Sequence, residues 1–238
     1  MDNLFSEIAL LDVNQLLLRN IVSLAEPEES SFDDLSDNQA DWSLAQKAAS
    51  DVNLMGYSSF EPEIYRPFEE AECFSAILWP FRHWQASRFS DGSFGVWYGS
   101  DAVETTVYET AFHWWCGFLA DAGLESESVV IRRQIFSVSC RAGILDFRPA
   151  VTSYPHLLHK SDYTFTRQIG ARIHREGHPG LVSFSVRHSG GLSYALLNPA
   201  VLSEPGHHSS LAYRLQNGVI EVEGPSGVVL MEIPVDRF

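Results

Sequence analysis

Apolar residues follow two different patterns along this chain of 238 residues, and the pattern changes near residue 72. Residues 4–24 carry apolar side chains at helical spacing, which predicts an amphipathic helix. The polar, acidic stretch 26–42 predicts a linker or exposed loop, and a second short helix is predicted over 42–54. We therefore expect residues 1–70 to form a partly helical N-terminal extension.

Residues 71–238 have the pattern of a domain built on a sheet. Two helices are predicted, one from a capping box near Asp101 to just before Gly123, and one over 161–177. Runs of aromatic and branched residues predict strands at 72–84, 94–100, 128–140, 144–147, 180–188 and 191–199, with a final hairpin that turns at Asn217-Gly218. Helices interrupt the strands irregularly, so an α+β fold with a mixed β core and flanking helices is favoured over a doubly wound sheet.

Charge changes this picture mainly at the front of the chain. The net charge is −15, and residues 1–75 hold 16 acidic but only 3 basic residues. Such a balance argues against direct binding of nucleic acid, which depends on basic patches. No apolar run is long enough to span a bilayer, and the three cysteines are scattered without a CxxC pair. We expect a cytoplasmic protein with no membrane segment and no metal site.

The helix predicted after Asp101 has one feature that its apolar character does not explain. Glu109 is the only side chain with a fixed charge between Thr105 and Ala120. A buried carboxylate costs several kcal/mol unless it is paired or hydrogen-bonded. Three explanations are open: Glu109 lies on a narrow exposed strip, it pairs with an arginine elsewhere, or it faces a polar pocket and takes part in chemistry.

Residues on both sides of this helix could share such a pocket with Glu109. Arg88 precedes a glycine-containing turn, and Tyr98 ends the strand that follows it. Downstream, strand alternation would send Ser183 and Ser185 to one face of the strand predicted after the second helix. An arginine, a tyrosine, a carboxylate and a serine can therefore converge on one cleft.

These residues resemble the motifs of the RES domain family, the toxin half of a bacterial toxin–antitoxin pair. The resemblance covers about residues 75–200, and the chain departs from the family's frequent Gly-Arg-Trp-Asn by having Ser-Arg-Phe-Ser at 87–90. The pieces that carry it are, in chain order, Arg88 and Tyr98 in SRFSDGSFGVWYGS, Glu109 in TTVYETAFHW, Gln168 and Gly170 in FTRQIG, Ser185 (or Ser183) in VSFSVR, and Asn198-Pro199 in ALLNP. Arg82 is the alternative to Arg88.

The resemblance implies an ADP-ribosyltransferase-like fold and an enzyme that uses NAD+ as its substrate, with no separate cofactor. Such an enzyme cleaves the nicotinamide–ribose bond by hydrolysis or phosphorolysis. Glu109 would stabilise the oxocarbenium-like transition state, and Arg88 would hold the pyrophosphate or an attacking phosphate. Tyr98 would stack against the nicotinamide or its ribose, while Ser185 and Gln168 would position the substrate.

The resemblance also implies a partner, a small helix-turn-helix antitoxin protein, and it is compatible with a homodimer. Two other functions fit the same residues. One is a mono-ADP-ribosyltransferase that modifies a protein. The other is a catalytically inactive binding module, whose acidic front third would recruit basic partners. The acceptor of the ADP-ribose (water, phosphate or protein) stays open at this level.

Overall fold

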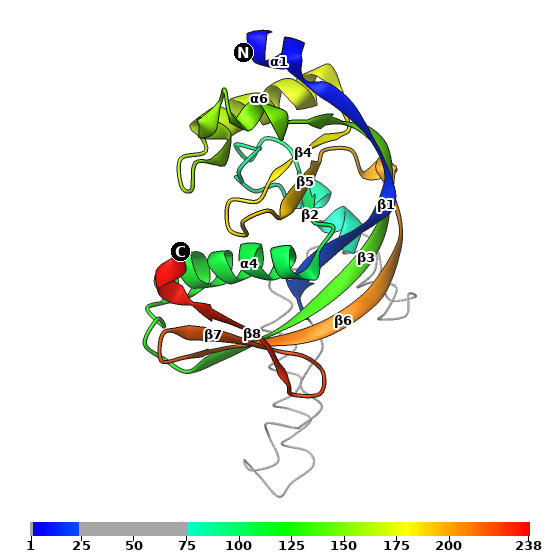
Figure 1. Ribbon diagram of the computed structural model, residues 1–238. Helices are drawn as coiled ribbons and strands as arrows, with labels where there is room; N and C mark the ends of the chain where they lie inside the picture. The colour runs from blue at the N-terminus through cyan, green and yellow to red at the C-terminus, as the bar shows by residue number, and fades with distance from the viewer. Residues whose placement is uncertain (1, 24–75) are drawn as a thin grey trace, which may run out of the picture. The chain divides into compact units, whose positions relative to one another are not determined.

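The computed structural model describes residues 2–23 and 76–238, and Figure 1 shows their arrangement. Residues 1–22 and 72–238 form one compact unit, and residues 23–71 form a second unit. The helix predicted over 42–54 lies outside the described residues. In the described part of the first unit, eight strands form one sheet with the order β2-β5-β4-β3-β6-β7-β8, and β1 pairs with β3.

The strands and helices have the following bounds. The strands are β1 Ala9–Val22, β2 Trp97–Gly99, β3 Val129–Asp146, β4 Gly180–Phe184, β5 Leu192–Leu196, β6 Leu202–Gln216, β7 Val219–Glu223 and β8 Val229–Pro234. The helices are α1 Asp2–Glu7, α4 Val103–His113, a π-helical continuation Trp114–Leu119, α5 Ala120–Ala122 and α6 Thr164–Glu176, with a further helical segment at 76–82. Strands β3 and β4 are parallel and the other pairs are antiparallel, so the predicted α+β fold with a mixed sheet is confirmed.

The helix predicted over residues 4–24 is wrong for most of its length. Only α1 is helical, and the chain then forms β1, which pairs with β3 from Ala9 opposite Asp146 to Val22 opposite Arg133. Val13 and Leu17 are buried on one face of β1, and both positions fit a period of two as well as helical spacing. Pairing with β3 decides between the two, because it gives partners to the backbone groups along one whole edge of the strand.

Two further predictions differ from the structure. Residues 76–82 are helical where a strand was expected, and the two strands expected at 128–140 and 144–147 are one continuous strand, β3. The predicted capping box is also absent, because Ala102 occupies the N-cap of α4 and makes no side-chain cap.

The glycine signals, in contrast, are confirmed. Gly123 and Gly177 end their helices in the left-handed conformation, with φ of 67° and 76°. The hairpin between β6 and β7 turns at Asn217 and Gly218, which both have positive φ.

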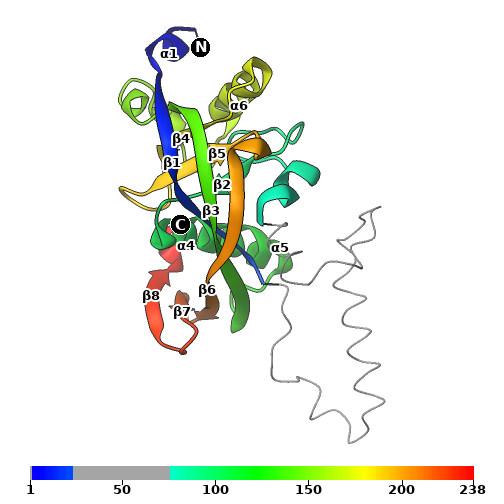
Figure 2. The same cartoon turned by 90° about the vertical axis from the view of Figure 1, so that its right-hand side faces the viewer.

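Helix α4 lies inside the curve of the long strands β1, β3 and β6 (Figure 1), which run side by side in Figure 2. Its inner face buries Val107 and Ala111, and these side chains belong to one cluster with Ile135 of β3 and Tyr213 of β6. This packing fixes the helix that carries Glu109. No helix in the described part of the chain is long and apolar enough to cross a membrane.

Candidate active site

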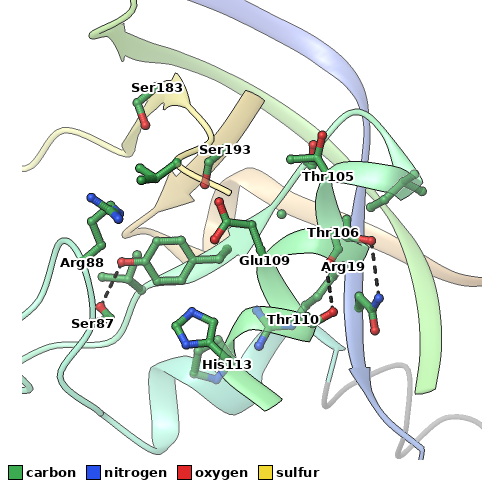
Figure 3. A pocket seen from close by; sticks show the side chains of 18 of the residues that line it. Arg19, Ser87, Arg88, Thr105, Thr106, Glu109, Thr110, His113, Ser183 and Ser193 are labelled. Carbon is green, nitrogen blue, oxygen red and sulfur yellow. Dashed lines mark hydrogen bonds between the residues drawn. The ribbon is translucent and has the colours of Figure 1, made fainter. Parts of the chain in front are cut away.

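A cavity of about 550 Å³ lies beside α4 and collects most of the residues singled out above (Figure 3). Arg88, Tyr98 and Glu109 all line it, as does Ser183. Glu109 is the only carboxylate among the described residues of the lining. The volume of the cavity falls in the range of pockets that bind small molecules and cofactors.

Glu109 is aimed by a serine beyond the end of β4. The Ser185 hydroxyl donates to Oε1 of Glu109 at 2.6 Å, and it accepts the backbone N–H groups of Arg187 and His188 at 3.1 and 3.0 Å. A serine hydroxyl has one proton and two lone pairs, so the two backbone donors leave its proton for the carboxylate. Glu109 forms no salt bridge in the described part of the chain. Of the three explanations above, the structure shows a carboxylate that faces a pocket.

Tyr98 is the middle residue of β2, and its hydroxyl holds the turn that carries Arg88. The hydroxyl accepts the backbone N–H of Phe89 at 3.0 Å and shares a hydrogen bond with Ser87 Oγ at 2.9 Å. Burial raises the pKa of Tyr98 to about 12, against the opposing effect of these hydrogen bonds, so the phenol is protonated at neutral pH. Its position links β2 to the turn before it.

Arg88 is half-buried, and no carboxylate among the described residues pairs with its charge. Its Nη1 donates to the carbonyl oxygen of His159 at 2.9 Å, and its guanidinium lies over the Tyr163 ring, 4.5 Å from the centroid. Burial lowers the pKa of Arg88, while the nearby Tyr163 and Glu109 raise it. The guanidinium therefore keeps donors for an anionic ligand.

The remaining predicted residues lie as follows. Ser183 is buried on β4 and lines the cavity, while Ser185 comes after β4 ends at Phe184, so strand alternation does not describe its direction. Gln168 is exposed on α6 and is absent from the lining of the cavity. Arg82, the alternative to Arg88, is exposed and is absent from it too.

Arg19 of β1 is a cavity residue that the sequence analysis missed. Its Nε and Nη1 are fully buried and have no hydrogen-bond partner among the described residues, and its guanidinium lies 5.5 Å from the centroid of the Trp97 ring. Burial lowers the pKa of Arg19 to about 10. A signal for it was present, since it is the one charged residue between Asp12 and Glu26. The helix prediction concealed that signal.

A buried hydrogen-bond network behind the cavity ties α4 to the strands. Asn20 of β1 accepts the Nε–H of Arg133 at 2.6 Å and donates to the hydroxyl of Tyr213 at 2.8 Å. The Tyr213 hydroxyl also bonds Thr110, the residue after Glu109, at 2.9 Å. Strands β1, β3 and β6 thus hold α4 by polar contacts as well as by apolar packing.

His113, a second residue that was not predicted for the site, ends α4 one turn after Glu109 and lines the cavity. His113 is an exposed residue, yet desolvation by the surrounding protein lowers the pKa of its ring, against the opposing effect of Glu109. Neither here nor in any other described part of the chain do three His, Cys, Asp or Glu side chains gather as metal ligands would.

The motif order seen in this site is that of a known family, and the family model of the RES domain matches residues 64–216. The chain belongs to the RES domain family. The family predicted from the motifs is thus confirmed, and the RES match contains Arg88, Tyr98, Glu109 and Ser185 but not Arg19.

This RES chain was also compared with individual known proteins. A search of curated proteins finds no match. Among solved structures, it is similar to the MbcT–MbcA toxin–antitoxin complex of M. tuberculosis, with 10% sequence identity and a TM-score of 0.46, over 89% of this chain and 90% of that chain.

Proposed function

We propose that this RES protein is an enzyme that cleaves the nicotinamide–ribose bond of NAD+, and that it acts as a toxin held in check by a helix-turn-helix antitoxin. One observation carries the proposal. Among the described residues that line the cavity, Glu109 is the single carboxylate, is directed by Ser185, and lies with the guanidiniums of Arg88 and Arg19. Neither guanidinium forms a salt bridge with a described residue.

One carboxylate is enough for this reaction. When the bond from C1′ to the nicotinamide nitrogen breaks, the electron pair goes to the nitrogen, and nicotinamide leaves as a neutral molecule that needs no acid. Positive charge develops on the ribose, and a fixed carboxylate beside it stabilises that charge more in the transition state than in the substrate. The Ser185 hydroxyl keeps Glu109 in one orientation, so little reorganisation is needed when the charge develops.

The two arginines suit the anionic part of the substrate. A guanidinium matches phosphate oxygens through forked hydrogen bonds, and it binds more strongly where water is excluded. Arg88 comes from the turn before β2 and Arg19 from β1, so the two can hold the pyrophosphate from different elements. No further cofactor is required, because the bond cleavage needs only a stabilised ribose and an acceptor.

NAD+ consumption by the purified full-length chain tests this function. We expect the wild type to release nicotinamide, and Glu109→Gln to slow the release by about 10²–10³-fold, the usual cost of removing one electrostatic stabiliser. Glu104→Gln is the matched control, because Glu104 is an exposed carboxylate on the same helix and does not line the cavity.

The products of the same assay identify the acceptor. Free ADP-ribose indicates water, ADP-ribose 1″-phosphate indicates phosphate, and label transferred to a macromolecule indicates a protein-modifying transferase. Equal NAD+ turnover in wild type and Glu109→Gln would contradict the assignment. No NAD+ loss by the wild type, together with tight binding to a partner protein, would favour an inactive binding module.

A further inference from the structure

Among the described residues, His83 and His113 are the histidines that line the cavity, and only His83 has a hydrogen-bond partner there. His83 bonds the carbonyl oxygen of Trp79 through Nδ1 at 3.2 Å and stacks on the Trp79 ring at 3.6 Å between centroids. His113 has no hydrogen-bond partner among the described residues, and its ring makes an edge-to-face contact with Phe112, at 5.2 Å and 71°. An imidazole that faces a polar cavity without a protein partner is free to bond a ligand or a water molecule.

His113 is also in reach of the reacting region. Residues four apart on a helix share a face, with Cβ atoms about 5–6 Å apart. Glu109 and His113 have this spacing on α4, and Figure 3 shows both side chains on the cavity side of the helix. A base placed one turn from the carboxylate that stabilises the ribose can contact a water molecule beside C1′.

We propose that His113 is the general base of the hydrolytic reaction, which takes a proton from the water molecule that attacks C1′ of the ribose. This inference rests on the proposed function and names the residue that would make water the acceptor. The bond from C1′ to nicotinamide breaks, with its electron pair on the leaving nitrogen. The water oxygen bonds C1′, and its proton moves to the free ring nitrogen of His113 and then to solvent. NAD+ and water thus give ADP-ribose, nicotinamide and one proton.

Glu109 is less suited to taking the proton from water, because its carboxylate is already held by a hydrogen bond. Its Oε1 accepts the Ser185 proton at 2.6 Å, which directs the carboxylate toward the developing charge. Assigning proton transfer to a separate imidazole lets the carboxylate remain in place through the reaction.

The charges around His113 favour its neutral, basic form at pH 7. Loss of water lowers its pKa below 6.5, and Arg187 after β4, Arg88 before β2 and Arg133 of β3 lower it further, whereas Glu109 raises it. A base must be unprotonated to act. The value of kcat/KM for hydrolysis is therefore at its maximum above the pKa of His113 and falls as the pH drops through that pKa.

The test compares NAD+ turnover by the full-length wild type, His113→Gln and the control His208→Gln from pH 5 to pH 8. His208 is an exposed histidine on β6, outside the cavity. Glutamine keeps hydrogen bonding but cannot take the proton, so His113→Gln should lose about 10²–10⁴-fold in hydrolysis and lose the acidic limb of the profile. His208→Gln should keep both.

A second arm uses sodium azide, an anionic nucleophile that carries no proton to remove. Azide should restore turnover to His113→Gln, with a ribosyl azide as product, but not to Glu109→Gln, which lacks the stabilising carboxylate. Hydrolysis by His113→Gln at the wild-type rate, or with the acidic limb intact, would overturn the role of His113. Failure of azide to restore a folded His113→Gln that still binds NAD+ would also overturn it. A wild type that does not consume NAD+ would instead overturn the proposed function itself.

Discussion

At the residue scale, the site depends on side chains whose partners come from backbone amides and not from opposite charges. Ser185 accepts two backbone N–H groups, which leaves its proton for the hydrogen bond to Glu109. Arg19 is the contrasting case, because two of its nitrogens are buried with no hydrogen-bond partner in the described part of the chain. A buried charge without a partner lowers the stability of the fold. Such a charge is retained where it binds a ligand.

Replacing Arg19 tests this trade between stability and binding. We expect Arg19→Met to unfold at a higher temperature than the wild type, because methionine fills similar space without a buried charge, and to bind NAD+ with a higher KM. Since burial lowers the pKa of Arg19 to about 10, its cost is fully present at neutral pH. That cost falls as the pH rises through the pKa of Arg19, so the difference in stability between wild type and Arg19→Met should shrink above it.

Thermal unfolding at pH 7 and near pH 10.5, together with NAD+ kinetics, measures both effects. Arg132→Met is a suitable control, because Arg132 is exposed on β3 and does not line the cavity. A less stable Arg19→Met with unchanged KM would show that the guanidinium is a structural group.

At the scale of elements, the turn that carries Arg88 is set by a close approach of α6. Gly170 lies on α6, and a methyl group at that position would collide with the carbonyl oxygen of Phe89, the neighbour of Arg88. The helix and the turn can touch only because this residue has no side chain. Gly170 therefore affects the cavity although it is absent from its lining.

We expect Gly170→Ala to push the turn at Phe89 away and to cost about 1–3 kcal/mol in the free energy of unfolding, as overpacking usually does. The value of kcat/KM for NAD+ should fall with it, because Arg88 moves. Gly117→Ala is the matched control, since no atom lies within 4 Å of a Cβ added there. Urea unfolding and NAD+ kinetics measure the two effects. Equal stability of Gly170→Ala and wild type would contradict the packing argument.

At the scale of the whole molecule, the family match and the folded unit do not have the same limits. The RES match begins at residue 64, yet β1 pairs along its whole length with β3 and supplies Arg19 to the cavity. The compact unit comprises residues 1–22 and 72–238. A strand far upstream of the RES match is thus part of the same sheet as β3.

A chain that starts at residue 64 should therefore fail to fold or should aggregate. Without β1, the edge of β3 loses its backbone partners and becomes free to pair with other chains. Circular dichroism and size-exclusion chromatography of residues 64–238 measure this, and adding residues 1–23 as a separate peptide should restore part of the fold. A truncated chain with the stability and turnover of the full-length protein would show that β1 is dispensable.

Local signals in the sequence were sufficient for a large part of this protein. The order of Arg88, Tyr98 and Glu109 predicted the family, and Gly123 and Gly177 marked helix ends because only glycine adopts their backbone conformation without strain. These signals depend on residues close in the chain. They could therefore be interpreted without knowing how the chain packs.

Other features were decided only by contacts between distant parts of the chain. The apolar residues of 4–24 fit a helix as well as a strand, and pairing with β3 made the choice. That choice brought Arg19 to the cavity, and the loop after β4, not strand alternation, turned Ser185 toward Glu109. The physical reason is the same in each case. Backbone and side-chain polar groups take whichever partners the packed structure offers, and periodicity along the chain carries no information about those partners.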